Sequence, residues 1–270
     1  MIVLIRGGGD LASGVAYRLH RAGLRVVITE LPQPLAVRRL VSFAEAVYRG
    51  EITIEGVTAR RIDDYTDTLR ILQVFTKGYI PVIVDPEGKS IQALHPSVVV
   101  DARMTKRRAD LIPTPVKLIV GLGPGFTVGE NCHAVVETKR GHTLGRVLWQ
   151  GSAEPNTGEP DPVGRWVSER VLRAPADGVL VAHKEICEHV EAGEVIAEVD
   201  GQPVKAPFSG VLRGIIHPGV FVKAGSKVGD VDPRDNPSYC TLISDKSLAV
   251  AGGVMEAILS RPELRATFWA

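Results

Sequence analysis

The chain has 270 residues, of which 44% are hydrophobic and 5% aromatic, and its formal net charge is +1 at pH 7. This length favours roughly two domains, and the near-neutral charge excludes the basic field of a general nucleic-acid-binding protein. No apolar run approaches about 18 residues and no signal-peptide pattern opens the chain, so we expect no membrane association. The three cysteines are far apart in the sequence, which is typical of a reduced, cytoplasmic protein.

A short apolar run over residues 2–5 predicts a strand that is buried on both faces. The segment "GGGDLA" at 7–12 follows it and matches the pattern G-x-G-x-x-A. The next residues have helical periodicity up to Gly23, and Asp10 is placed to cap that helix. A strand, a glycine loop and a helix in this order favour a Rossmann-type phosphate-binding unit.

A second strand is predicted over 25–29 and ends at Glu30. Dinucleotide folds place the carboxylate that binds a ribose hydroxyl at this point, about 20 residues after the loop. We therefore expect a nucleotide or another anion to be bound by Gly7, Gly8, Gly9, Asp10 and Glu30. The alternative is that the glycines only form a tight turn. Because the Asp10 carboxylate would repel a pyrophosphate, either it caps the helix with its charge turned away, or the ligand is not a simple dinucleotide.

Further strands of the buried type alternate with helical patterns, as at 65–75, and this alternation predicts a parallel, doubly wound sheet. These strands are expected at 56–60, 81–85, 96–101 and 117–120. Ligands of such sheets bind at the carboxyl ends of the strands. Asp101 and Arg103 stand at one such end, where they form part of a site, a surface ion pair or an anchor for the loop.

A second glycine-rich loop, "GLGPG", follows the strand at 117–120. No helix pattern comes after it, because residues 132–138 and 143–149 alternate like a hairpin. The loop therefore lacks the contribution of a helix dipole, but its backbone N–H groups can still form an anion nest. We expect that nest to be formed by Gly121, Gly123 and Gly125.

Cys132 stands beside this second loop, near Arg140 and His142 in the sequence. A free cysteine is most often a small buried hydrophobic residue, whereas a polar and basic setting favours an exposed thiol with a lowered pKa. Both alternatives stay open, and the second makes Cys132 a candidate nucleophile. The sequence has no H-x-x-x-H or C-x-x-C pair, so no metal site is expected.

Residues 151–164 are rich in Gly, Pro, Asn, Glu and Asp, which is typical of a linker or a lid. An internal repeat of 32 residues follows, with "RAPADGVL" at 173–180 and "KAPFSGVL" at 205–212. One copy is too short to bury its own apolar face, so the two copies should pair about a pseudo-twofold axis. The repeat resembles the barrel-sandwich hybrid of biotinyl and lipoyl domains. The matching hairpin tip at 199–203 has no lysine, so no lipoyl or biotin group is expected.

These patterns predict an α/β protein with a Rossmann-like, mostly parallel sheet domain over residues 1–164. A small all-β barrel-sandwich hybrid domain is expected over residues 165–238. The last segment, 239–270, contains a helical pattern at 244–259, and we expect this helix to return to the first domain.

Several motifs in combination resemble the YqeB family over nearly the whole chain: "RGGGDLASG", "DARM", "GLGPGF", "NCHAVVETKRGHTLGRV" and "GSAEPNTG". That family is thought to comprise accessory proteins for the maturation of selenium-dependent molybdenum hydroxylases. The resemblance implies a molybdopterin-type cofactor or a nucleotide as ligand, and the hydroxylase apoenzyme and other maturation factors as partners. It leads to the hypothesis that Cys132, as a thiolate or persulfide analogue, helps to insert sulfur or selenium.

Two other classes of protein stay open. An NAD(P)-dependent oxidoreductase would use Gly7, Gly9 and Glu30 to bind its cofactor. A non-catalytic scaffold would dock the hydroxylase through the small β domain. The resemblance implies a pathway rather than a reaction, so the sequence leaves open whether the chain is an enzyme.

Overall fold

A computed structural model describes residues 1–105, 107–112, 115–156 and 169–268. The chain divides into two compact units. The first unit consists of Met1–Pro32, Phe43–Asn156 and Ile243–Ala270, and the second of Gln33–Ser42 and the described part of Thr157–Leu242. No helix among the described residues has the length and apolar character needed to cross a membrane.

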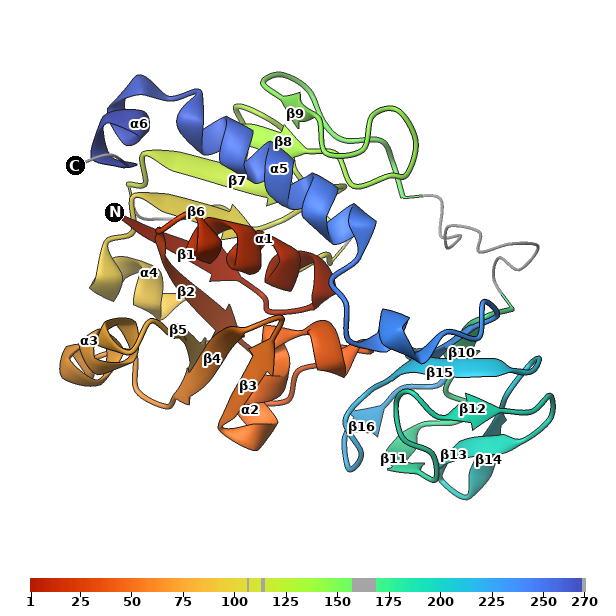
Figure 1. Cartoon of the computed structure of the whole chain (residues 1–270). Coiled ribbons are helices and arrows are strands. Elements are labelled where there is room, and N and C mark those ends of the chain that lie inside the picture. Colours follow the sequence, from red (N-terminus) through yellow and green to blue (C-terminus); the bar gives the residue numbers. More distant parts are fainter. Residues whose placement is uncertain (106, 113–114, 157–168, 269–270) are drawn as a thin grey trace. The chain divides into compact units, whose positions relative to one another are not determined.

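One large sheet forms the centre of the first unit (Figure 1). Among the described residues it has nine strands, in the order β3-β4-β5-β2-β1-β6-β7-β8-β9. The strands are β1 (Ile2–Arg6), β2 (Arg25–Glu30), β3 (Glu51–Ile54), β4 (Val57–Ile62), β5 (Ile80–Val84), β6 (Val98–Asp101), β7 (Leu118–Leu122), β8 (Ala134–Val136) and β9 (Val147–Leu148). The central strand β1 is buried on both faces, since Val3, Leu4 and Ile5 are all fully buried.

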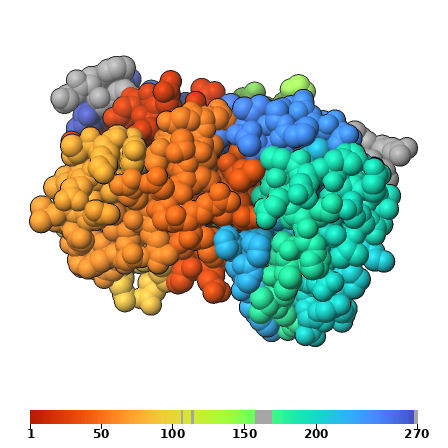
Figure 2. Space-filling view, turned by 60° about the horizontal axis from the view of Figure 1, so that its bottom comes forward, coloured from red at the N-terminus to blue at the C-terminus, as the bar shows by residue number. Residues whose placement is uncertain are grey.

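The large sheet is parallel in its centre and antiparallel at both edges. The strands from β4 to β8 in the sheet order run parallel to their neighbours, whereas β3 pairs with β4 and β9 with β8 in antiparallel fashion. The β3–β4 hairpin turns at Glu55 and Gly56, which both have positive φ, as a two-residue hairpin turn requires. Residues of this hairpin belong to the orange surface in Figure 2, together with the neighbouring residues of the chain.

Helices cover both faces of this sheet. They are α1 (Asp10–Arg21), α2 (Ala46–Arg49), α3 (Thr68–Thr76), α4 (Lys89–Leu94), α5 (Asp245–Leu259) and α6 (Pro262–Phe268). The first unit also contains the short 3-10 helix η2 (Phe43–Glu45), whereas the 3-10 helix η1 (Arg39–Val41) belongs to the second unit. Helices α1 and α5 lie side by side in front of the sheet in Figure 1. Gly14 permits this close approach, because a Cβ there would lie 2.6 Å from the Cβ of Ser247. The helix predicted at 244–259 is confirmed as α5, whose N-cap is Ser244.

The second unit consists mainly of two antiparallel sheets. Among its described residues, one sheet has the order β10-β17-β15-β12 and the other β14-β13-β11-β16. The strands are β10 (Val171–Arg173), β11 (Gly178–Ala182), β12 (His189–Val190), β13 (Val195–Val199), β14 (Gln202–Lys205), β15 (Gly210–Ile215), β16 (Phe221–Val222) and β17 (Lys227–Asp232), followed by the 3-10 helix η3 (Pro237–Cys240).

Each copy of the sequence repeat contributes two strands to each of these sheets. The first copy supplies β10 to β13, and the second supplies the corresponding strands β14 to β17. When each strand is replaced by its counterpart in the other copy, the strand order of one sheet becomes that of the other. The backbone repeats as well, because Gly193 and its counterpart Gly225 have φ values of +83° and +78°. The strands of one copy therefore pair largely with strands of the other, which a single copy could not do alone.

The predicted fold class is wrong on both counts. The large sheet is a mixed sheet and not the Rossmann-like sheet that was expected, because short antiparallel strands close both edges of its parallel centre. The described part of the second unit has two four-stranded antiparallel sheets, and a biotinyl-like barrel-sandwich is not supported. The physical reason is that a repeat pattern predicts strands and their spacing, but it does not say into which sheet each strand is hydrogen-bonded.

Candidate functional site

The candidate site lies at the carboxyl ends of β1 and β6. From β1 the chain continues through α1 to β2 on one side, whereas β6, on the other side of β1, is reached from β5 through α4. In open α/β sheets such a reversal of strand order leaves a crevice outside the strand ends, and ligands bind there. Arg6 and Asp101 are paired in register at this point.

Arg6 and Asp101 form a buried ion pair. The Nη1 atom of Arg6 lies 3.2 Å from Oδ2 of Asp101, and the two side chains are only 5% and 1% exposed. Arg103 donates to the same carboxylate through Nε at 3.0 Å and Nη2 at 2.7 Å. Because a buried carboxylate is costly without a partner, these two guanidinium groups stabilise the charge on Asp101.

Asp110 joins this network from the segment after β6. Its carboxylate accepts from Arg103 Nη2 and lies 3.4 Å from Arg6 Nη1. Partial burial alone would raise the pKa of Asp110, but the hydrogen bond from Arg103 and the charge of Arg6 hold it below its usual value. Burial opposes the charge on Arg103, but Asp101 and Asp110 outweigh it and raise the pKa of Arg103. Arg103, 27% exposed, stays charged and reaches solvent.

Gly7 connects the first glycine loop to this network. It has a φ of +92°, a backbone conformation that glycine adopts at little cost. A Cβ at Gly7 would lie 3.3 Å from both the carbonyl oxygen of Ala102 and the Cα of Arg103. The structure thus brings together the predicted residues Gly7, Asp101 and Arg103.

Gly8 is enclosed by its own chain. Its N–H donates to Oε1 of Glu30 at 2.6 Å, and its carbonyl accepts from Ser13 Oγ at 3.0 Å and from the Ala44 N–H at 2.9 Å. The second oxygen of Glu30 accepts from the Leu31 N–H at 2.8 Å. Burial raises the pKa of Glu30, although these two N–H bonds oppose the shift. The Gly8 N–H is therefore already bonded to a carboxylate of the protein and is not free to bind a ligand.

Gly9 presents an open face. It is the N-cap residue of α1 with a φ of −66°, and a Cβ built there would meet no atom within 4 Å. Asp10 was predicted to be the cap, but it is the first residue of the helix itself. A carboxylate in the first turn still interacts favourably with the helix dipole.

The second glycine loop is packed against its own neighbours. A Cβ at Gly121 would overlap the Phe126 ring, one at Gly123 the Thr138 hydroxyl, and one at Gly125 the carbonyl oxygen of Arg107. The N–H of Gly123 donates to the carbonyl of Val136 at 2.9 Å. These glycines therefore allow close packing within the protein, and their surroundings give no support to the predicted anion nest.

Cys132 is buried beside this loop. It is 5% exposed and belongs to an apolar cluster with Ala109, Phe126, Val135 and Ala153. Burial raises the pKa of the Cys132 thiol to about 11, although backbone hydrogen bonds with Gly121 and Ala134 oppose this shift. Of the two alternatives for Cys132, the structure shows the buried one, because the residue packs in apolar surroundings while Arg140 pairs with Asp245.

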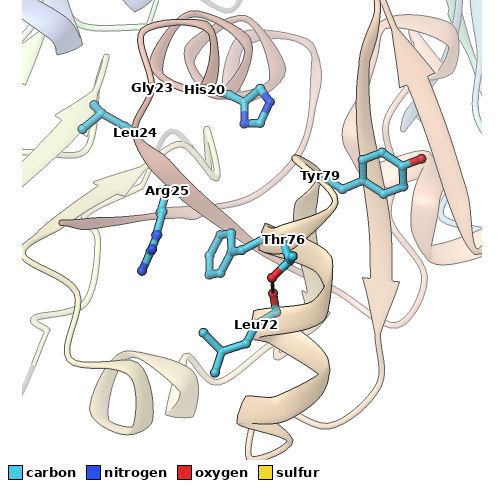
Figure 3. Close-up of a pocket in the computed structure, with 8 residues that line it drawn as sticks. His20, Gly23, Leu24, Arg25, Leu72, Thr76 and Tyr79 are labelled. Carbon is cyan, nitrogen blue, oxygen red and sulfur yellow. Dashed lines mark hydrogen bonds between the residues drawn. The ribbon is translucent and has the colours of Figure 1, made fainter.

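A cavity of about 240 Å³ lies away from all these residues, at the amino end of β2 (Figure 3). It is lined by residues of α1, β2 and α3 and their ends, namely His20, Gly23, Leu24, Arg25, Leu72, Phe75, Thr76 and Tyr79. The Arg25 guanidinium lies 5.9 Å from the centre of the Phe75 ring. Burial and the charge of Arg21 lower the pKa of His20. No pattern in the sequence pointed to this cavity.

Arg6 and Asp110 are site residues that the sequence did not reveal. A signal existed for Arg6, which is a charged residue at the end of an apolar strand and directly before a glycine loop. In the described part of the chain, no group of three or more His, Cys, Asp or Glu side chains is placed to hold a metal ion.

Comparison with known proteins gives one similar curated sequence. It is 43% identical over 262 residues, which cover 96% of this chain and 47% of the other protein. That relative is "Uncharacterized protein YqeB" of Escherichia coli (strain K12). The chain spans about half the length of this relative, and the likeness supports the resemblance to the YqeB family. No family model matches the chain.

Solved structures show only remote similarity. An aspartoacylase family protein from Mesorhizobium loti has 11% identity and a TM-score of 0.26, and a succinylglutamate desuccinylase from Silicibacter sp. has 15% identity and a TM-score of 0.25. Each match covers 85% of this chain and 84% of the other. Scores this low carry no inference about this chain.

Proposed function

We propose that the chain is an accessory protein that binds an anionic, phosphate-bearing cofactor at the carboxyl ends of β1 and β6. The observation that carries this proposal is the position of Arg103. Its guanidinium remains charged and partly exposed at the reversal of strand order. A Cβ built on Gly7 would lie 3.3 Å from its Cα, so its backbone stands beside the first glycine loop. A cation beside a loop that opens a helix is a common setting for phosphate.

The residues around Arg103 fit such a group in part. Gly9 has an open face at the amino end of the 12-residue helix α1, which is the positive end of its dipole. Arg103 can hold the ligand's charge, because its partner Asp110 is 61% exposed and can be displaced. Gly8 does not fit, since its N–H is bonded to Glu30. We therefore place the anion at Gly9 and Arg103 and not deeper in the loop.

We extend this proposal to a molybdopterin-type cofactor and to the maturation of selenium-dependent molybdenum hydroxylases. This extension rests on the family resemblance, and it makes the hydroxylase apoenzyme and other maturation factors the partners. Insertion of sulfur or selenium by Cys132 gains no support from its burial and raised pKa. The function that we propose is therefore the binding and handling of the cofactor.

An NAD(P)-dependent oxidoreductase is less well supported. Both oxygens of Glu30 accept from backbone N–H groups, of Gly8 and of Leu31. A ribose hydroxyl would have to compete with these bonds for the carboxylate. Tight binding of NADH or NADPH in a titration would reverse this preference.

The proposal is tested by denaturing freshly purified protein and identifying the released small molecules by mass spectrometry. We expect a phosphate-bearing cofactor, and about tenfold lower occupancy in Arg103→Met, because one charge-assisted contact is lost. Arg103→Lys keeps the charge and should retain most of the ligand. Arg25→Met is the matched control, since it removes the same charge at the opposite end of the strands, beside the cavity of Figure 3.

Two results would contradict the proposal. The first is the release of no phosphate-bearing molecule while a hydroxylase subunit co-purifies, which would favour a scaffold. The second is equal occupancy in Arg103→Met and in the unmodified protein. Loss in Arg25→Met alone would move the ligand to the cavity at the amino end of β2.

A further inference from the structure

Two cysteines that are far apart in the sequence meet in the second unit. The N–H of Cys187 donates to the carbonyl of Leu212 at 3.0 Å, and Sγ of Cys240 lies 3.8 Å from the same oxygen. Cys187 lies between β11 and β12, and Cys240 ends η3. The two residues therefore converge on one point of β15.

Cys187 has a strained backbone conformation, as a comparison with the second copy of the repeat shows. Cys187 has a φ of +82°, which is costly for a residue with a side chain. Its counterpart in the second copy of the repeat is Gly219, with a φ of +84°. Glycine adopts this conformation at no such cost. The first copy thus keeps a thiol at a position where the fold favours glycine, and strain of this kind marks functional positions.

The two thiols have different access to solvent. Cys240 is 1% exposed, whereas Cys187 is only partly buried. Burial, and then the neighbouring Cys187 thiol, raise the pKa of Cys240 to about 12, while the charge of Arg213 opposes the shift. The Arg213 side chain also holds the end of η3, because its Nε donates to the Tyr239 carbonyl at 3.3 Å.

We propose that Cys187 and Cys240 form a redox-active dithiol that exchanges with low-molecular-weight disulfides of the glutathione type. Cys187 is the attacking thiol because it is accessible, and Cys240 is the resolving thiol because it is buried next to it. The proposal concerns the second unit alone and does not depend on cofactor binding in the first.

The exchange proceeds in two balanced steps. The Cys187 thiolate attacks one sulfur of the small disulfide, forms a mixed disulfide with it and releases one thiolate. Cys240 then loses its proton and attacks Sγ of Cys187, which releases the second thiolate and forms the Cys187–Cys240 bond. The two protein thiols are oxidised by two electrons, the small disulfide is reduced to two thiols, and the two protons pass to the released thiolates.

Equilibration of the intact, native chain with mixtures of reduced and oxidised glutathione tests this proposal. After acid quenching and alkylation, we expect the free thiols to fall from three to one, with the Cys187–Cys240 bond identified by peptide mass spectrometry. Cys132 is the internal control and should stay reduced, since it is buried in an apolar cluster. Cys240→Ser should accumulate glutathione on Cys187, and Cys187→Gly should lose both products while keeping the native circular dichroism spectrum.

Two outcomes would overturn the proposal. One is a protein that keeps three free thiols under oxidising mixtures. The other is glutathione that remains on Cys187 equally in the unmodified chain and in Cys240→Ser, because Cys240 would then resolve nothing. Since Cys187→Gly places the residue of the second repeat copy at this position, its folding is not expected to limit the comparison.

Discussion

The two glycine-rich loops of the first unit follow parallel strands of the same sheet, yet their glycines have different roles. In the loop after β1, Gly8 is enclosed by bonds to the protein whereas Gly9 faces open space. At the end of β7 and in the loop after it, Gly121 and Gly125 are both places where a Cβ would overlap other residues. The first loop therefore leaves space for a ligand beside Gly9, whereas other residues of the protein pack against the glycines of the second.

This difference shows what a G-x-G pattern does and does not predict. It indicates that the backbone is approached closely or turns with positive φ. Whether a ligand or the protein itself makes the approach depends on the residues that follow. After Gly9 a helix begins, with its positive dipole end at the loop, whereas after Gly125 the chain turns back and places Phe126 over Gly121.

The largest expected effect is that of Gly121→Ala. The new methyl group would overlap the Phe126 ring, which is itself buried. We expect a loss of about 3 kcal/mol in the free energy of unfolding, as for other overpacked cores. Urea denaturation followed by circular dichroism measures this loss.

The control for Gly121→Ala is the same substitution in a Phe126→Ala background, which removes the Cγ and Cδ1 atoms that the new methyl group would meet. If the overlap is the cause, the smaller side chain should restore part of the stability, and the double-mutant cycle should show a coupling energy of about 1 kcal/mol or more. Additive effects in the cycle would mean that the loop is not filled by Phe126.

The sequence predicted the parallel strands at the centre of the sheet better than its edges. Central strands such as 2–5 are continuous apolar runs, which are easily recognised. The edge strand β3 is partly exposed, and its pairing with β4 depends on the turn at Glu55 and Gly56. For the same reason the repeat predicted strands in the second unit but not their division into two sheets.

The candidate site was predicted only where neighbours in sequence are neighbours in space. Asp101 and Arg103 interact locally, so their place at a strand end was recognisable. Arg6 joins them only through the pairing of β1 with β6. Asp110 joins them through the course of the irregular segment after β6, and no local pattern encodes either contact. The burial of Cys132 likewise depends on residues that only the fold brings together.

A smaller effect is expected for Gly7→Ala. The substitution places a side chain at a φ of +92° and within 3.3 Å of the backbone after β6. We expect a loss of about 1 to 2 kcal/mol, most of it from the backbone conformation. Gly23→Ala is the matched control, because Gly23 has a φ of +91° and no neighbour within 4 Å of a Cβ. If Gly7→Ala costs no more than Gly23→Ala, the contact with the residues after β6 has no energetic weight.

A pH dependence is expected from Glu30, which closes the first loop at Gly8. Because the pKa of Glu30 is raised above 4.5 by burial in the folded protein, its contribution to stability is fully present below pH 4.5 and is lost as the pH rises through the folded-state pKa. Glu30→Gln should remove this part of the pH dependence of unfolding while leaving the rest of the curve in place. Parallel curves for the two proteins would mean that Glu30 is not the group that titrates in this range.

The smallest effect on stability is expected for Gly9→Ala, and it bears most directly on the difference between the loops. Any residue can adopt the backbone conformation of Gly9, and a Cβ there would meet no other atom within 4 Å. The loss in the free energy of unfolding should therefore be about 0.5 kcal/mol, the cost of a poorer N-cap. If a phosphate group approaches the backbone at Gly9, the added methyl group should nevertheless lower the amount of phosphate-bearing ligand that co-purifies, by about tenfold for a lost close contact. Mass spectrometry of the denatured variant, normalised to folded protein, measures this amount. Unchanged occupancy would show that the ligand does not lie at Gly9. The glycine loops after β1 and β7 would then differ only in how closely the protein packs against them.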